Sequence, residues 1–164
     1  CPFTHIHPRR IHSKLFMKTG IFVGSFDPFT IGHQAILDRA LPLFDRIVVG
    51  VGVNERKNYM QSTDIRVRTI THLYRNEPKI TVKAYSDLTI DFAARENAHY
   101  IIKGVRSIKD YEYEREQADI NRSIGGIDTL FFYSDPQFAA VSSSMVRELA
   151  HFGKDISEFL PTDK

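Results

Sequence analysis

The residues of this chain that could do chemistry are concentrated in one glycine-containing turn, residues 24–33 (GSFDPFTIGH), which follows a short apolar run. Gly24 lets the backbone turn sharply, and Gly32 lets a ligand approach the start of the helix predicted next. His33 would lie in or near the first helical turn, where free N–H groups and a partial positive charge suit a phosphate. An imidazole there can donate a hydrogen bond to a phosphate oxygen. An ordinary glycine-rich turn with a surface histidine would show the same pattern.

Three cations follow later apolar runs and could reach the same ligand. Lys57 lies in the polar segment 54–58, and Lys103 and Arg106 lie on either side of Gly104. Arginine can form bidentate hydrogen bonds to phosphate oxygens, and lysine supplies a point charge, so these residues could hold a phosphate. The alternative is that Lys57 is an exposed loop lysine and that the other two form surface ion pairs.

Several other polar residues have both a structural and a chemical interpretation. Ser142, Ser143 and Ser144 precede a predicted helix, where they either cap its backbone or add hydroxyl donors to a phosphate site. Glu114 follows two tyrosines and is consistent with a solvated helix acid. The side chain of Asp27 could simply stabilise the turn in which it lies.

The spacing of apolar residues predicts the elements that must position these side chains. Strands are expected over residues 20–23, 46–53, 79–84, 99–102 and 129–133. Helices are expected over 34–44, 62–73, 87–93, 111–124 and 143–150, with caps at Ser62, at Ser86 or Asp87, and at Ser142 or Ser143. The first helix should end early or kink at Pro42, and the second should bury Ile65, Val67, Ile70 and Leu73. The alternation predicts an α/β, Rossmann-like fold: a five-stranded parallel sheet with helices on both faces and a ligand beyond the carboxyl ends of the strands.

Composition and charge bound the class of protein. The 164 residues, 42% of them hydrophobic, are typical of one soluble globular domain. The net charge of +2 comes from residues 1–16, so the rest carries no basic excess for a nucleic acid. We expect residues 1–16 to be a leader, tag or upstream extension, with Met17 as the natural start. No run approaches the length of a membrane span. The only cysteine is Cys1, so the rest of the chain is free of cysteine, which fits a reducing cytoplasm.

Taken in order, these motifs resemble a known family. Residues 24–28, followed by Thr30-x-Gly32-His33, resemble the (T/H)xGH signature of the nucleotidyltransferase superfamily, and residues 141–147 (VSSSMVR) resemble its second signature. Residues 86–88 (SDL), 103–106 (KGVR) and 110–114 (DYEYE) follow the order and spacing of bacterial phosphopantetheine adenylyltransferases. The resemblance runs from residue 18 to 161 and implies that 17–164 is a single nucleotidyltransferase domain. One departure is Lys103, where the family often has arginine. Lysine keeps the charge but cannot form bidentate hydrogen bonds.

The resemblance implies transfer of AMP from ATP to 4′-phosphopantetheine by direct in-line attack, without a covalent enzyme intermediate. The products would be dephospho-CoA and pyrophosphate, the penultimate step of coenzyme A biosynthesis. It implies catalytic roles for His33, Lys57 and Arg106. The residues it implies for phosphopantetheine are Ser25, Lys57, Thr89 and Lys103. The residues it implies for ATP are Ser25, Phe26, His33, Gly104, Val105, Arg106, Glu114, Phe138, Ala139, Ala140, Val141, Ser142, Ser143 and Ser144.

The family also implies Mg²⁺ carried on the ATP phosphates without protein ligands, coenzyme A as a candidate feedback ligand, a homohexamer and a cytoplasmic location. Two alternatives stay open: a related nucleotidyltransferase with another phosphate acceptor, such as nicotinamide mononucleotide or glycerol phosphate, and a non-catalytic nucleotide-binding module. The chain has no G-x-x-x-x-G-K-[ST] motif and no G-x-G-x-x-G fingerprint, which excludes a P-loop enzyme and a dinucleotide-binding fold of that type.

Overall fold

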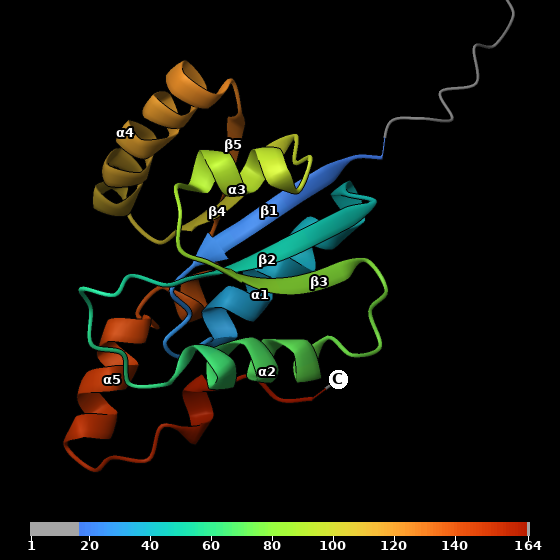
Figure 1. The fold of residues 1–164 in the computed structure, drawn as a ribbon. Coiled ribbons are helices and arrows are strands. Elements are labelled where there is room, and N and C mark those ends of the chain that lie inside the picture. Colours follow the sequence, from blue (N-terminus) through green and yellow to red (C-terminus); the bar gives the residue numbers. More distant parts are fainter. Residues whose placement is uncertain (1–16, 164) are drawn as a thin grey trace, which may run out of the picture.

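The structure is a computed structural model that describes residues 17–163. The predicted leader, residues 1–16, lies outside the described part of the chain. Within that part, the strands and helices alternate along the sequence (Figure 1). None of the helices in residues 17–163 is both long enough and apolar enough to cross a membrane.

Five strands form one parallel sheet, as the sequence predicted. In chain order they are β1 (Thr19–Gly24), β2 (Arg46–Gly52), β3 (Ile80–Tyr85), β4 (Tyr100–Val105) and β5 (Asp128–Tyr133). Their order across the sheet is β3-β2-β1-β4-β5, and every neighbouring pair is parallel. The chain therefore winds outward from β1 in one direction and then, from β4, in the other. Such a reversal opens a crevice at the carboxyl ends of β1 and β4, where ligands of this type of sheet bind.

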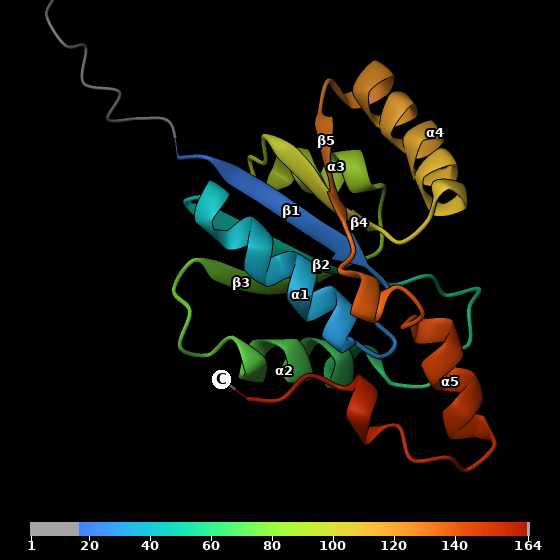
Figure 2. The ribbon, with the colours of Figure 1, turned by 180° about the vertical axis from the view of Figure 1, so that it is seen from behind.

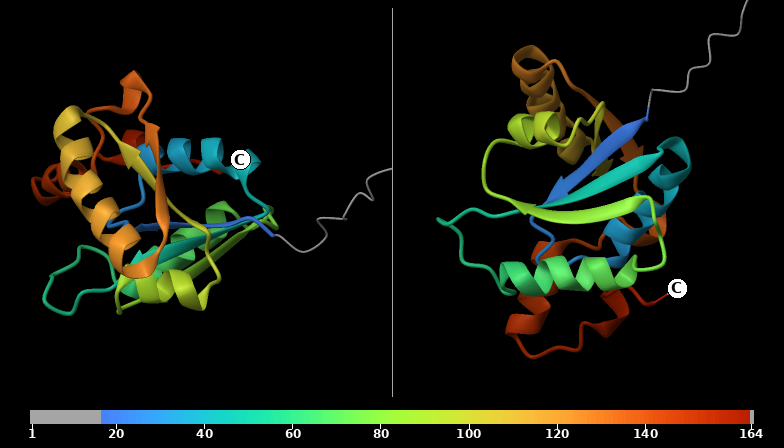
Figure 3. Two further views of the ribbon diagram at one scale, coloured as in Figure 1. Left: turned by 90° about the horizontal axis from the view of Figure 1, so that it is seen from above. Right: turned by 45° about the vertical axis from the view of Figure 1, so that its right-hand side comes forward.

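Helices cover both faces of the sheet. α1 (Ile31–Ala40) and α2 (Thr63–Leu73) lie on one face, and α3 (Thr89–Arg95) and α4 (Ile108–Gly125) on the other (Figures 2 and 3). Adjacent residues of a strand point to opposite faces, so Phe22 of β1 packs with α1 and Ile21 packs with α3. α5 (Ser143–His151) stands at the carboxyl end of the strands, where it closes one side of the crevice.

Several predicted boundaries were wrong because of caps and strand pairing. α1 begins at Ile31, not residue 34, because Thr30 caps it. α4 likewise begins at Ile108, because Ser107 accepts the N–H of Asp110 at 3.1 Å. β4 continues to Val105, three residues beyond the predicted end, because its pairing with β5 continues that far. The predicted early end of α1 is confirmed: a 3-10 turn (Leu41–Leu43) with proline in its first turn follows it.

The start of α3 and the buried face of α2 also differ from the prediction. The N-cap of α3 is Leu88, which makes no side-chain cap bond; the predicted cap Asp87 pairs with Arg95 instead, at 2.7 Å. On α2, Ile65 is 46% exposed, whereas Arg66 is only 1% exposed. The buried face of α2 thus passes through a charged residue that the apolar pattern did not include.

Candidate active site

His33 is held by the cap of its own helix. Thr30, the N-cap residue of α1, accepts the N–H of His33, and the N–H of Thr30 donates to Nδ1 of His33 at 2.9 Å. This reciprocal pair is a capping box with histidine in place of the usual glutamate or glutamine. Because Nδ1 accepts a hydrogen bond, the proton of a neutral ring must be on Nε2. The local sequence therefore sets which nitrogen of His33 can donate.

The electrostatics around His33 keep the ring neutral. Burial, together with the nearby positive charges of Arg106 and Lys103, lowers the pKa of His33 to about 4. A neutral imidazole with Nε2–H is a hydrogen-bond donor at neutral pH without carrying a charge of its own. Such a group can bind an oxygen that gains negative charge during a reaction.

Two phenylalanine rings of the β1–α1 loop pack on the imidazole. The ring of Phe26 meets His33 edge-on, with centroids 5.0 Å apart, and the ring of Phe29 lies 5.3 Å away at 31°. Phe26 has φ = 50°, in the left-handed region that residues other than glycine rarely adopt. Phe26 thus combines an unusual backbone conformation with a buried ring that packs against His33.

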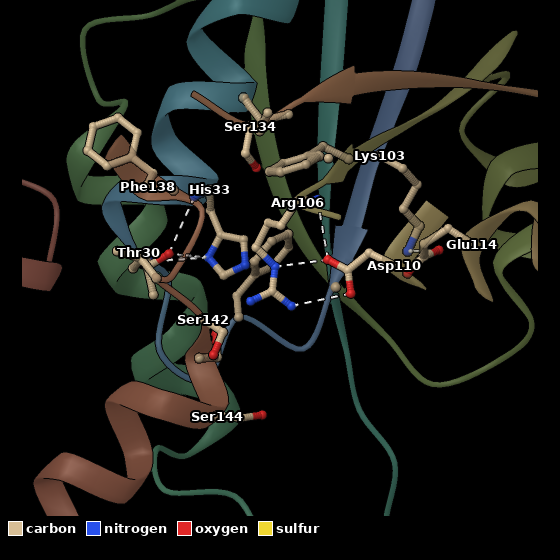
Figure 4. Close-up of a pocket in the computed structure, with 18 of the residues that line it drawn as sticks. Thr30, His33, Lys103, Arg106, Asp110, Glu114, Ser134, Phe138, Ser142 and Ser144 are labelled. Carbon is tan, nitrogen blue, oxygen red and sulfur yellow. Dashed lines mark hydrogen bonds and ion pairs between the residues drawn. The ribbon is translucent and has the colours of Figure 1, made fainter. Parts of the chain in front are cut away.

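Two cations, Lys103 near the end of β4 and Arg106 directly after it, reach the same site, but each has an acidic partner from α4. Arg106 Nε is 3.0 Å from Asp110 Oδ2, and Lys103 Nζ is 3.6 Å from Glu114 Oε2 (Figure 4). The surface ion pairs that the sequence allowed as an alternative are therefore present. They do not exclude phosphate binding, since all four residues line one pocket with His33. A bound phosphate would compete with the two carboxylates for the cations.

The three serines at the start of α5 play different structural parts. Ser142 is the N-cap and accepts the N–H of Met145 at 3.1 Å, which confirms the capping prediction. Ser143 donates its hydroxyl to the carbonyl of Pro28 at 2.8 Å, and Ser144 accepts from Arg147 at 3.1 Å. All three line the pocket. The Ser143 contact ties the start of α5 to the loop that carries His33, 110 residues away in sequence.

These residues surround a pocket of about 310 Å³, called here the His33 pocket. Among the residues predicted for ATP, the pocket lining includes Phe26, His33, Gly104, Arg106, Glu114, Phe138, Val141, Ser142, Ser143 and Ser144. Val105 is buried instead, and Ala139 and Ala140 are exposed outside the lining. The pocket lining also includes three residues to which the sequence assigned no binding or catalytic role: Thr30 and Asp110, which belong to the motifs quoted above, and Ser134. Asp110 could have been found from its i+4 spacing to Arg106, and Thr30 from its capping distance to His33.

A second hollow of about 690 Å³, called here the Lys57 cleft, adjoins the first one at Gly24, which lines both. It brings together three of the four residues predicted for the phosphate acceptor: Ser25, Lys57 and Thr89. The fourth, Lys103, lines the His33 pocket instead. Tyr85, which the sequence analysis missed, lines the cleft and makes a 3.1 Å hydrogen bond with Thr89 through their hydroxyls.

Asp27 does not stabilise its own turn, as the sequence suggested. Its carboxylate accepts the backbone N–H groups of Met60 and Gln61, both at 2.8 Å, and the residue is 2% exposed. Met60 and Gln61 follow the segment 54–58 that carries Lys57. Asp27 thus connects the loop beside the His33 pocket to the loop of the Lys57 cleft.

The geometry suits a reaction between two phosphate-containing molecules. One pocket offers a neutral histidine donor, two cations and a helix start, and the neighbouring cleft offers Lys57 and the hydroxyl of Ser25. No group of three or more metal-ligating side chains occurs within residues 17–163. The arrangement can hold two anionic groups in adjoining hollows, with His33 in the lining of the first.

Known proteins share both the sequence and the fold. The cytidylyltransferase-like family model matches residues 21–149. The phosphopantetheine adenylyltransferase of Bacteroides thetaiotaomicron is 47% identical over 145 residues, which cover 88% of this chain and 96% of that protein. The same enzyme of Porphyromonas gingivalis is 44% identical over 141 residues, covering 86% and 92%.

A solved structure gives the same fold at low identity. A bifunctional NMN adenylyltransferase/ADP ribose pyrophosphatase from Francisella tularensis superposes with a TM-score of 0.67 at 14% identity, over 91% of this chain and 46% of that one. This likeness concerns the fold alone. The family match and the close relatives together show that the chain belongs to the cytidylyltransferase-like nucleotidyltransferases and, among them, to the phosphopantetheine adenylyltransferase family.

Proposed function

We propose that this protein transfers the adenylyl group of ATP to 4′-phosphopantetheine, giving dephospho-CoA and pyrophosphate. The observation that carries the proposal is the junction at Gly24, where the His33 pocket and the Lys57 cleft meet. A reaction between two bound phosphates requires such a junction. Family membership supplies the identity of the two substrates.

The proposed reaction needs no protein nucleophile. An oxygen of the phosphopantetheine phosphate attacks the α-phosphorus of ATP, a new P–O bond forms in line, and the bond to the pyrophosphate oxygen breaks. The acceptor is already an anion, so the protein contributes position and charge stabilisation rather than a covalent intermediate. The neutral Nε2–H of His33 is suited to bind the α-phosphate as its charge increases.

We assign the remaining residues by the hollow that they line. Ser25 and Lys57 would hold the attacking phosphate, and Thr89 with Tyr85 would contact the pantetheine arm. Arg106, Lys103 and the start of α5 would hold the ATP phosphates. Lys103 therefore moves from the acceptor set to the ATP set, because its ion pair with Glu114 lies in the His33 pocket.

We also propose that Mg²⁺ binds through the ATP phosphates. Asp110 and Glu114 are the acids in the His33 pocket, and each is paired with a cation of the protein. A donor set of this kind fits a metal that keeps its waters and its phosphate ligands rather than a protein cage. When bound, Mg²⁺ would supply charge neutralisation on the phosphates.

A homohexamer, feedback by coenzyme A and a cytoplasmic location remain proposals. The assembly is supported by α4, an 18-residue helix with no buried residue, whose Ile120 and Ile124 are 51% and 70% exposed. Feedback is supported by chemistry, since coenzyme A shares the pantetheine arm of the proposed acceptor. A cytoplasmic location is supported by the need for ATP.

The test is pyrophosphate release from ATP by the purified protein with a panel of acceptors. We expect release with 4′-phosphopantetheine and formation of dephospho-CoA in equal amount. Pyrophosphate release only with nicotinamide mononucleotide or glycerol phosphate would indicate a related nucleotidyltransferase that uses another phosphate acceptor. ATP binding without release for any acceptor would indicate a non-catalytic module.

A further inference from the structure

Arg66, on α2, is a buried charge without a counter-charge. The residue is 1% exposed, and it forms no ion pair with a carboxylate within residues 17–163. Its Nε also has no hydrogen-bond partner among the described residues. Burying a guanidinium in this way is costly, and arginine is rarely fully buried unless it is paired. An apolar side chain could fill the same buried position on α2, so packing alone does not explain why an arginine is there.

Three of the residues that Arg66 contacts line the Lys57 cleft. Nη1 donates to the carbonyl oxygens of Ser25 at 2.7 Å and Gly52 at 3.1 Å, and the guanidinium lies 3.9 Å from the ring centre of Tyr59. Those three residues line the cleft. Nη2 donates to Oγ1 of Thr63 at 3.2 Å, which anchors the group to the start of α2. The charge of Arg66 therefore lies directly behind the wall of the cleft, across the carboxyl ends of β1 and β2.

The bond to Ser25 orients the peptide at the junction of the two hollows. Ser25 lines the Lys57 cleft, and the next residue, Phe26, lines the His33 pocket. In a trans peptide the carbonyl and the following N–H point in opposite directions. When Arg66 holds the Ser25 carbonyl, it also sets the direction of the Phe26 N–H and the position of the Ser25 side chain.

We propose that Arg66 is a positioning residue for the phosphate of the acceptor. It holds Ser25 and Gly52 in place at the floor of the Lys57 cleft, and its unpaired charge makes the cleft attractive to an anion. Two acids line the cleft. Asp87 is already paired with Arg95, and Glu55 is next to Arg56 and Lys57, two cations of the same lining, so the cleft keeps a positive charge. This inference rests on the proposed function, because it deepens the assignment of the Lys57 cleft to the phosphate acceptor.

The test compares Arg66→Met and Arg66→Lys with a matched control, Arg46→Met. Arg46 is half-buried at the opposite end of β2 and pairs with Glu96 at 3.2 Å, away from both hollows. We expect Arg66→Met to raise the KM for 4′-phosphopantetheine by about tenfold or more, as loss of charged hydrogen bonds does. The KM for ATP should stay within about twofold, and Arg66→Lys should recover part of the loss because it keeps the charge. Arg46→Met should lower the melting temperature without changing the ratio of the two KM values.

A second measurement separates the phosphate from the rest of the acceptor. The inhibition constant of unphosphorylated pantetheine against 4′-phosphopantetheine should be the same in wild type and Arg66→Met, because Arg66 acts on the phosphate end. An equal change in both KM values, or an unchanged KM for 4′-phosphopantetheine in a folded Arg66→Met, would overturn the proposal. If Arg66→Met does not fold, Thr63→Val removes one acceptor of Arg66, and it should raise the same KM by about twofold to threefold.

Calorimetric binding of 4′-phosphopantetheine distinguishes a failure of this inference from a failure of the proposed function. A wild type that binds the compound but does not adenylate it would refute the proposed function and leave Arg66 testable by affinity. A wild type that turns it over, with equal affinity in Arg66→Met, would refute the role of Arg66 alone. No binding by the wild type would refute both.

Discussion

The backbone N–H of Thr30 donates to Nδ1 of His33 at 2.9 Å, so one interaction both caps α1 and selects the tautomer of the candidate catalytic histidine. The two roles can be separated by substitution. Glutamine at the same position can accept the Thr30 N–H through its side-chain oxygen, as in the usual capping box. Alanine cannot.

We predict that His33→Gln keeps the stability of the fold and that His33→Ala loses about 1 kcal/mol from the missing cap bond. Both variants should lower kcat by about 10²–10³, because each lacks the imidazole donor, and should raise the KM for ATP less. Urea unfolding and steady-state kinetics measure the two effects separately. A wild-type kcat in either variant would remove His33 from the mechanism.

The low pKa of His33 predicts how stability depends on pH. The unfolded histidine has a pKa of 6.5 and the folded one about 4, so between these values the unfolded chain binds more protons. The free energy of unfolding contributed by His33 is therefore fully present above pH 6.5 and is lost as the pH falls toward 4. His33→Gln should lack this part of the slope. Identical pH dependence of wild type and His33→Gln in urea titrations would contradict the assignment.

The acceptor cleft gives a prediction that does not involve His33. Lys57→Ala should weaken phosphopantetheine binding by roughly 1.5–3 kcal/mol, the value of a charged hydrogen bond. Thr89→Trp should block the pantetheine arm, because its bulk replaces the hydroxyl that contacts Tyr85 inside the cleft, and should leave ATP affinity nearly intact. Isothermal titration with each substrate measures both. Wild-type kcat/KM for phosphopantetheine in Thr89→Trp would place the acceptor elsewhere.

Asp27 should matter for the loop that carries Lys57. Asp27→Ala leaves the N–H groups of Met60 and Gln61 without their acceptor, at a cost of about 1.5–3 kcal/mol in stability. We also expect a higher KM for phosphopantetheine and faster hydrogen exchange of those two amides. Asp45→Ala is a control, since the Asp45 carboxylate accepts the N–H of exposed Lys18, at 2.7 Å, at the other end of the sheet. Equal exchange rates in Asp27→Ala and wild type would show that Asp27 does not hold the loop.

Glu96 should control stability in acid without affecting the site. Burial would raise the pKa of Glu96, but its bonds to Lys83 at 2.6 Å and Arg46 at 3.2 Å outweigh that effect and lower it. The stability from this carboxylate is present above its ordinary pKa of 4.5 and is lost as the pH falls below that value. Glu96→Gln should lower the urea midpoint at neutral pH and flatten its decline in acid, with the KM values unchanged. A parallel decline in both proteins would rule out this role.

The parallel five-stranded sheet, the signature around His33 and the family could all be predicted from the sequence. These features are local: β-branched runs, helical spacing and the turn 24–33 can each be identified within about ten residues. The serine cap of α5 belongs to the same group, because a cap bonds to its own helix.

Which distant residues share a site depends on how the strands and loops come together in the fold. Asp27 bonds to residues 33 and 34 positions away, Ser143 bonds to Pro28, and Lys103 lines the His33 pocket rather than the Lys57 cleft. The buried position of Arg66 was equally unpredictable. A helical pattern identifies an apolar stripe, but a polar side chain is buried only where carbonyls from other strands can accept its hydrogen bonds. The carbonyls of Ser25 and Gly52 come close together only when β1 and β2 pair, and no local pattern in the sequence predicts that they do.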